Sequence, residues 1–164
     1  MKLDVTLALK NPGQEYLFRG EQAIAPQEIS GDTVTFDDAI LEGTYFATDD
    51  GSVQVDGKLT TVAHAHCANC LEPASADIQA TFRETFLRNG DPEDDEIFTY
   101  TGSCVGFEKL AMSYAVLALP MRFLCREDCP GLVGFADNDT CQKEMQNEHP
   151  FAALQQLLTK DEEV

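Results

Sequence analysis

The sequence has little positive charge. Eleven lysine and arginine residues stand against 29 aspartate and glutamate residues, which gives a formal net charge of −18. Because proteins bind nucleic acid mainly by neutralising phosphates with lysine and arginine, this balance opposes direct binding of a phosphate backbone. We expect most of the acidic side chains to form a solvated surface that keeps the protein soluble. A basic partner is the second interpretation of this charge.

Long apolar segments are also missing. The first five residues lack the continuous apolar core of a signal peptide. The densest apolar run near the middle, Ala115–Met121, is far too short to cross a bilayer and contains Pro120. We therefore expect a soluble, cytoplasmic protein with no membrane partner. In that compartment the six cysteines are expected to be thiols or metal ligands rather than disulfides.

Familiar catalytic motifs are absent from the sequence. There is no Gly-rich phosphate loop, no H-E-x-x-H and no G-x-S-x-G. His64 and His66 lie close to Cys67, but nothing identifies an orienting group or an oxyanion hole for a cysteine nucleophile. A redox dithiol is disfavoured because acidic surroundings raise the pKa of a thiol. We expect a protein that is not an enzyme, with a thiol-dependent enzyme as the less favoured alternative.

Alternating apolar residues dominate the first hundred positions and predict strands. Leu3, Val5, Leu7 and Leu9 predict the first strand. Asp49–Ser52 is typical of a tight turn between two later strands, and Asp56-Gly57 predicts a second turn or a bulge. The other predicted strands lie at about 16–20, 34–36, 40–46, 53–55, 58–66, 78–86 and 97–100.

The period of the apolar residues changes after residue 101. Positions 107, 110, 111, 114, 117 and 118 recur at helical spacing and predict a helix that Pro120 ends, with Leu117 on its buried stripe. A second helix is expected to begin at Pro150. The expected fold is α+β, an antiparallel β-rich sheet or partly open barrel with one long helix packed on it and a short C-terminal helix. We expect a single domain of residues 1–164: residues 1–101 mainly β, and residues 102–164 with the helix, a cysteine-containing irregular segment and the C-terminal helix.

Four of the cysteines form two close pairs. Cys67 and Cys70 make a C-x-x-C, and Cys125 and Cys129 make a C-x-x-x-C. Structural zinc takes four soft ligands in a tetrahedron, and two such pairs can supply them from distant parts of a chain. The 54 residues between the pairs exceed what a compact zinc ribbon uses. Buried thiols that pack as small apolar groups therefore stay open beside a metal site, for which Cys141 and His66 are substitute ligands.

Three segments together carry a family resemblance: CANCLEP at 67–73, LALPM at 117–121 and CREDCPGL at 125–132. Their order resembles the bacterial YceD-like family, whose members are called large ribosomal RNA subunit accumulation proteins. Segments 16–20 and 149–154 extend the resemblance over nearly the whole chain. It implies a cytoplasmic, non-enzymatic factor that supports normal levels of large-subunit ribosomal RNA, and it makes a structural zinc site plausible. Many members carry a second cysteine knuckle after the Gly-Leu, and here Cys141 alone remains in that region.

One departure from the family bears on its partner. Asn69 stands where the family often has arginine, so this chain lacks a guanidinium that would bind phosphate there. Together with the net charge, this favours a basic ribosomal or ribosome-assembly protein as partner, with large-subunit ribosomal RNA reached indirectly. Strand edges and the cysteine turn are the expected contact surface. The alternative is a direct RNA-binding module with a local basic patch of Arg83, Arg88, Arg122 and Arg126.

Overall fold

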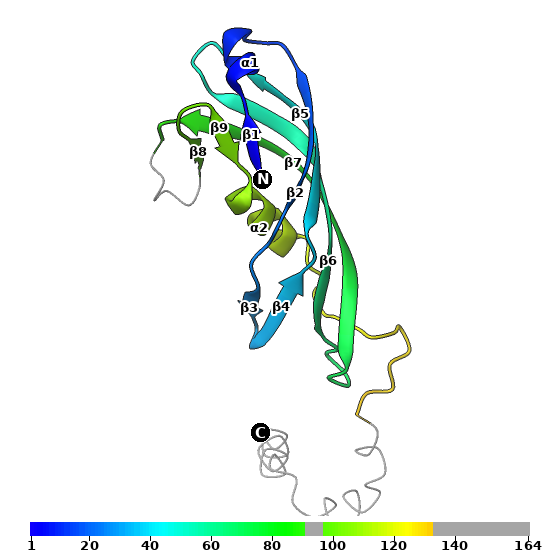
Figure 1. The fold of residues 1–164 in the computed structure, drawn as a ribbon. Helices are drawn as coiled ribbons and strands as arrows, with labels where there is room; N and C mark the ends of the chain where they lie inside the picture. Colours follow the sequence, from blue (N-terminus) through cyan, green and yellow to red (C-terminus); the bar gives the residue numbers. More distant parts are fainter. Residues whose placement is uncertain (91–96, 133–164) are drawn as a thin grey trace, which may run out of the picture. The chain divides into compact units, whose positions relative to one another are not determined.

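The computed structural model describes residues 1–90 and 97–132 (Figure 1). The chain divides into a compact first unit, Met1–Cys129, and a second unit, Pro130–Val164, of which three residues are described. All the strands and helices of the described ranges belong to the first unit. The single domain spanning residues 1–164 stays a prediction.

One seven-stranded sheet forms most of the first unit. The longest strands, β6 and β7, form an antiparallel hairpin. On its other side, β6 pairs antiparallel with β5 along Val53–Thr60 and then with β4 at Ala63 and His64. β2 lies beyond β5 and β3 beyond β4, while β8 pairs parallel with the end of β7. The bounds are β2 Tyr16–Gln22, β3 Gln27–Ile29, β4 Asp32–Phe36, β5 Ala39–Ala47, β6 Val53–His66, β7 Pro73–Arg88 and β8 Phe98–Tyr100.

The remaining elements are short. β1 (Lys2–Asp4) pairs antiparallel with β9 (Cys104–Gly106) in a separate two-stranded sheet. The helices are α1 (Thr6–Lys10) and α2 (Glu108–Leu117), and α2 contacts β6 and β7 (Figure 1). No helix in the described ranges has the length and apolar character needed to cross a bilayer.

The expected α+β class with one long helix packed on the sheet is wrong. Of the described residues, 51% lie in strands, and the two helices among them are short. Helix α2 has ten residues and ends at Leu117, three residues before Pro120. Its first turns bury Leu110 and Ala111 completely, but Leu117 is 79% exposed, so the predicted buried stripe stops before the helix does. The predicted short C-terminal helix lies outside the described residues.

The predicted first strand is also wrong in its second half. Strand β1 ends at Asp4, and the chain turns into α1 at Thr6. The Asp4 carboxylate accepts hydrogen bonds from the Thr6 backbone N–H at 2.9 Å and from its hydroxyl at 2.5 Å. Such a local side-chain bond competes with strand pairing and favours a turn. The apolar alternation from Leu3 to Leu9 therefore continues across a change of secondary structure.

A row of four residues crosses the middle of the sheet. Register places Phe18, Gly43, Gly57 and Phe82 side by side on β2, β5, β6 and β7. A Cβ atom on Gly43 would lie 2.1 Å from the Asp56 carbonyl oxygen, and one on Gly57 would lie 2.8 Å from the Phe82 ring. The two glycines therefore permit a backbone approach that no other residue allows. Strand β6 pairs without interruption through Gly57, so the predicted turn or bulge there is wrong, whereas the turn at Asp49–Ser52 does join β5 to β6.

Aromatic side chains form the centre of the core. Phe107, at the start of α2, is fully buried and packs on Phe18 and Phe86 with ring centroids 5.3 and 5.8 Å away. Phe82 packs on Tyr114 of α2 at 5.6 Å. The predicted strand at 78–86 is confirmed within β7, where Ile78, Phe82 and Phe86 face this core. The short helix thus covers the inner face of the sheet near its middle.

Candidate metal centre

The two cysteine pairs meet at the tip of the β6–β7 hairpin. The Sγ atoms of Cys67, Cys70, Cys125 and Cys129 all lie within 4.8 Å of one another. Cys70 Sγ is 3.6 Å from Cys125 Sγ, and Cys67 Sγ is 3.8 Å from Cys129 Sγ. The prediction that the two turns are neighbours is confirmed. We call these four residues the cysteine cluster.

The first cysteine turn connects β6 to β7 directly. The Cys67 backbone N–H donates to the Glu72 carbonyl at 2.8 Å, and the Leu71 N–H donates to the Cys67 carbonyl at 2.9 Å. Leu71 has a φ of 64°, a left-handed conformation that is unfavourable by about 1–2 kcal/mol for a residue with a Cβ atom. The turn is therefore tightly closed, and it holds Cys67 and Cys70 on one side of the hairpin tip.

The second cysteine turn reaches the first through the segment after α2. That segment runs back along the hairpin toward its tip (Figure 1). The Ala68 N–H donates to the Phe123 carbonyl at 2.9 Å, which fixes this segment against the first turn two residues before Cys125. The Cys129 N–H donates to the Arg126 carbonyl at 3.2 Å and closes the second turn. Two turns separated by 54 residues are thus joined by a backbone hydrogen bond as well as by the proximity of their sulfurs.

The sulfur geometry fits a tetrahedral zinc ion. Zinc–sulfur bonds of about 2.3 Å in a tetrahedron place the sulfurs about 3.8 Å apart. The Cys70–Cys125 and Cys67–Cys129 distances, 3.6 and 3.8 Å, match this spacing and greatly exceed the length of a disulfide bond. The five cysteines of the described ranges are all free thiols. Cys67 is buried and Cys125 is exposed, so the cluster lies at the surface with one ligand anchored in the protein.

The thiols of the cluster differ in acidity. Backbone N–H groups of Cys125 and Asn69 bond to Cys67 and lower the pKa of its thiol to about 6. The expectation that acidic surroundings raise this thiol pKa is wrong, because the nearest groups are amide donors. The neighbouring thiols of Cys70 and Cys129 instead raise the pKa of Cys125 to about 12. For Cys70, the Glu72 N–H lowers the pKa, but burial and the Cys129 and Cys67 thiols outweigh it and raise the pKa.

This pattern suits a cation. The lowered pKa of Cys67 favours its thiolate, and the raised pKa values of Cys70 and Cys125 favour their thiols, because thiolates in close contact would repel one another. A bound metal replaces those protons and removes the repulsion. The close thiols and their altered pKa values are therefore consistent with a metal-binding ligand set.

The histidines near the cluster bind carboxylates instead. His66 donates its backbone N–H to Asp32 Oδ2 at 2.9 Å, and its Nδ1 lies 2.7 Å from Asp32 Oδ1. These bonds lower the Asp32 pKa. His64 Nε2 lies 3.1 Å from Asp37 Oδ1. The structure thus leaves His66 out of the cluster, and Cys141, the other substitute ligand, lies outside the described residues.

A groove of about 650 Å³ lies beside the cysteine cluster. Its lining comes from the β3–β4 hairpin, the end of β6, the first cysteine turn and the segment after α2. Most of it is apolar, and two of its members, Leu71 and Met121, are 64% and 107% exposed. Asp32 and Arg122 are polar members. No local sequence pattern indicates this groove, because its walls are joined only when the second cysteine turn folds back.

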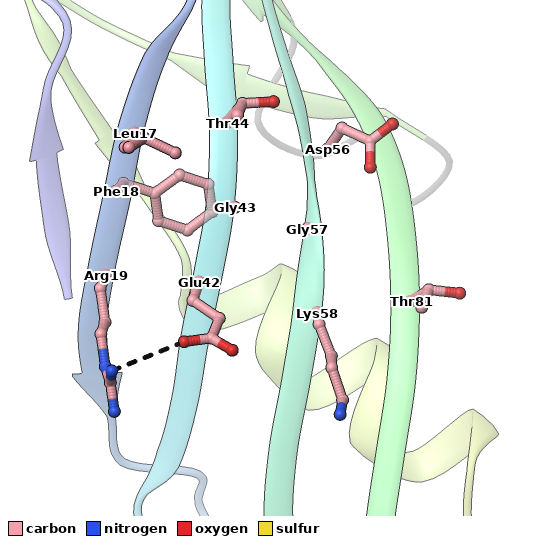
Figure 2. A pocket seen from close by; sticks show the side chains of 10 residues that line it. All are labelled: Leu17, Phe18, Arg19, Glu42, Gly43, Thr44, Asp56, Gly57, Lys58 and Thr81. Carbon is pink, nitrogen blue, oxygen red and sulfur yellow. Dashed lines mark ion pairs between the residues drawn. The ribbon is translucent and has the colours of Figure 1, made fainter.

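A second depression lies over the glycine pair (Figure 2). Gly43 and Gly57 are among the residues that line this shallow hollow, together with outward-facing residues of β2, β5, β6 and β7. Arg19 lies opposite Glu42, with 3.8 Å between the charged atoms, and Lys58 lies opposite Glu42 on the other side. Charges of both signs alternate across the strands, so the depression has no strong affinity for either sign.

The four arginines of the RNA-binding alternative do not gather in one patch. Arg122 lines the groove near the hairpin tip, whereas Arg88 ends β7 at the opposite end of the hairpin. Arg83, between them on β7, donates to Asp56 at 2.6 Å. With about 3.3 Å per strand residue, Arg88 lies about 50 Å from the start of β7.

Known proteins similar to this chain share the region of the cysteine cluster. A family model described as Large ribosomal RNA subunit accumulation protein YceD matches residues 55–158, a range that contains both cysteine turns. Uncharacterized proteins from Mycobacterium bovis and from two strains of Mycobacterium tuberculosis are 24% identical over 139 residues, which cover 80% of this chain and 67% of theirs. No solved structure gave a significant match. The chain therefore belongs to the YceD family, whose name links it to accumulation of the large ribosomal RNA subunit.

Proposed function

We propose that this protein is a non-enzymatic factor of ribosome biogenesis that binds a basic ribosomal or ribosome-assembly protein and thereby supports accumulation of large-subunit ribosomal RNA. Family membership supports the process. The net charge of −18 supports a basic partner. The observation that carries the proposal is the exposed apolar groove beside the cysteine cluster, because such a surface is typical of a site for another protein.

The cysteine cluster has a structural part in this proposal. Zinc bound by Cys67, Cys70, Cys125 and Cys129 would cross-link the hairpin tip to the segment after α2. Both walls of the groove would then be fixed in place, since Leu71 belongs to the first turn and Met121 precedes the second. Four protein ligands leave no open coordination position for water or substrate, which is the pattern of a structural rather than a catalytic zinc site.

The groove has a mostly apolar lining, and exposed carboxylates lie on the two cysteine turns beside it. Leu71 and Met121 offer exposed apolar area, and methionine adapts its shape to a partner surface. Glu72, Glu127 and Asp128 are exposed on the two cysteine turns. A basic segment with apolar side chains would bury the groove residues and pair with these carboxylates. The overall negative charge would speed its encounter in a manner that salt weakens.

The test is affinity purification from the cells of origin, with the metal content measured on the same sample. We expect wild-type protein to recover basic large-subunit or assembly proteins, and Met121→Asp to lose them because it puts a charge into the apolar groove. Leu17→Asp is the matched control: Leu17 is 85% exposed and lies on the outer face, away from the groove lining.

Nuclease treatment of the bound sample separates protein from RNA as the direct contact. Partner proteins that stay bound after nuclease support the proposal. Recovery that depends entirely on RNA would favour the RNA-binding alternative, and recovery of neither ribosomal proteins nor precursors would contradict both.

A further inference from the structure

Strand β7 has a long unpaired edge. β6 pairs with one side of it from Pro73 to Phe86, and β8 pairs with the other side from Phe86 to Arg88. From Ala74 to Thr85, no strand of the described ranges pairs with that second side. At about 3.4 Å per residue, this edge is about 40 Å long. The backbone N–H and C=O groups that point to this side make no hydrogen bond to the backbone of another described residue, so they can pair with another strand.

This edge lacks the features that usually block strand addition. Proteins protect exposed edges with proline, lysine, bulges or inward-pointing charges. Between Ala74 and Thr85 there is no proline, lysine or glycine, and pairing with β6 has no bulge. The inward carboxylate, Glu84, accepts a hydrogen bond from the Tyr114 hydroxyl at 2.5 Å. It is therefore satisfied within the chain and does not oppose a neighbouring strand.

We propose that a second copy of this chain pairs with this edge in antiparallel orientation, about a two-fold axis at Ala80. In this register Asp77 lies opposite Arg83 of the second copy, and Arg83 lies opposite Asp77 of the second copy. Both side chains are exposed on the outer face of β7, and Arg83, which donates to Asp56 of its own copy at 2.6 Å, would lie between two carboxylates. Two opposite-charge cross-strand pairs form, each favourable by about 0.2–1 kcal/mol. The interface is isologous, as a closed dimer requires.

The charges select this register. A shift of one residue would bring the apolar inner face of one copy to the outer face of the other. Registers with Asp77 or Arg83 on the axis would oppose like charges. At Ala80, the inner face instead sets Ile78 opposite Phe82 of the second copy and alanine opposite alanine.

Helix α2 provides a second, independent observation. Tyr114 holds α2 over the inner face of β7 through Phe82 and Glu84. Leu117 lies nearly one turn further along the same helix and is 79% exposed. This leucine is exposed apolar area on the helix that packs on β6 and β7. A strand added to β7 extends the sheet on which α2 packs. This proposal goes beyond the proposed function and does not depend on it.

The test is sedimentation equilibrium of the full chain across a wide concentration range, at 0.15 M salt or above so that repulsion between two acidic copies is screened. We expect a dimer of about 36 kDa, twice the chain mass of 18.0 kDa. Asp77→Arg places an arginine opposite Arg83 of the other copy at both symmetry-related positions, and it should weaken the dimer at least tenfold. The exchanged pair Asp77→Arg with Arg83→Asp should restore part of it, because it rebuilds both pairs between the copies but loses the Arg83 bond to Asp56.

Asp38→Arg is the matched control. It makes the same change in net charge at an exposed position away from β7, so it should leave the dimer intact. Hydrogen exchange of the wild-type protein gives a readout that needs no variant: amides of residues 74–85 should exchange more slowly at high protein concentration than at low. A monomer at every concentration, a dimer that Asp77→Arg leaves unchanged, an exchanged pair that restores none of it, or concentration-independent exchange would each overturn the proposal.

Discussion

The two ends of the β6–β7 hairpin are held by different chemistry. At one end Val53 and Phe86 are buried, and Phe86 packs on Phe98 and Phe107 with ring centroids 5.3 and 5.8 Å away. At the other end His66 and Pro73 are exposed, and a cluster of four sulfurs joins the hairpin tip to a distant segment. The first end is an ordinary apolar core, and at the second end four free thiols from two surface turns lie close together.

This difference separates what folds the protein from what shapes its site. Burial of one large apolar side chain contributes about 1.5–3 kcal/mol and needs no ligand. The cysteine end has little apolar area of this kind, so its order should depend on a bound metal. The stability loss caused by a substitution should therefore be independent of chelator at the apolar end and depend on chelator at the cysteine end.

The largest effect is expected from Phe107→Ala. Phe107 is fully buried between Phe18 and Phe86, and its truncation leaves a cavity under the sheet. We expect a loss of about 3–5 kcal/mol in the free energy of unfolding, measured by urea denaturation. The loss should be the same with and without chelator. A loss that disappears in chelator would mean that the two ends are not independent.

A smaller and metal-dependent effect is expected from Cys67→Ser. Removal of one of four ligands abolishes tight zinc binding, which stabilises by about 2.7 kcal/mol when free zinc is about one hundred times its dissociation constant. The wild-type melting temperature should fall in chelator, and that of the variant should start low and stay unchanged. Cys104→Ser, at an exposed thiol outside the cluster, is the control and should melt as wild type. If the wild type melts identically in chelator and holds no metal, the four thiols are core residues only.

A pH dependence is expected in the metal-free protein. Amide donors lower the Cys67 pKa from 9.0 to about 6 in the folded state. The folded state therefore releases a proton that the unfolded state keeps between these values, so stability should rise from about pH 6 to pH 9 and fall away as pH drops through 6. Cys125 acts in the opposite direction only above pH 9, since its folded pKa of about 12 exceeds the unfolded value. Melting temperature and thiolate absorbance against pH measure this, and Cys67→Ser should flatten the rise.

The smallest effect is expected from Leu117→Asp. The sequence pattern predicts that this change unfolds the protein, but the side chain is 79% exposed. We expect the free energy of unfolding, measured at low protein concentration, to stay within about 0.5 kcal/mol of wild type. Leu110→Asp, at a fully buried position of the same helix, should unfold the protein. If both variants lower the free energy of unfolding equally, the buried stripe of α2 extends to Leu117 as the sequence pattern predicts.

The two ends of the hairpin also differ in how far local sequence predicts them. Strands with a two-residue period, such as β7, and the turn before β6 follow from local pattern, because burial on one face leaves a direct trace in the sequence. Helix α2 is predictable in place but not in length, since apolar residues near Leu117 continue past the point where the sheet covers them. Asp56-Gly57 resembles a turn or bulge in sequence, because the reason for Gly57 lies on neighbouring strands, where the Phe82 ring and the Glu42 carbonyl occupy the space.

In the candidate metal centre, the four cysteine ligands can be predicted from residue type, whereas the contacts that hold the cysteine turns depend on the folded chain. Two cysteine pairs are recognisable at any separation, so the four sulfurs can be predicted as a group that lies together. The partners of that group are not predictable: Phe123 holds the second turn through a backbone carbonyl, and Asp32 holds His66 from a strand more than thirty residues away. Neither contact leaves a pattern in the local sequence.

The most direct test of the central claim is the zinc content of the native protein and of two single variants. One zinc ion per chain is expected in the wild type, because the four sulfurs form one tetrahedral set. Cys70→Ser and Cys125→Ser should both lose it, although they belong to different turns. Zinc retained in either variant, or its absence from native protein purified without chelator, would contradict a shared site.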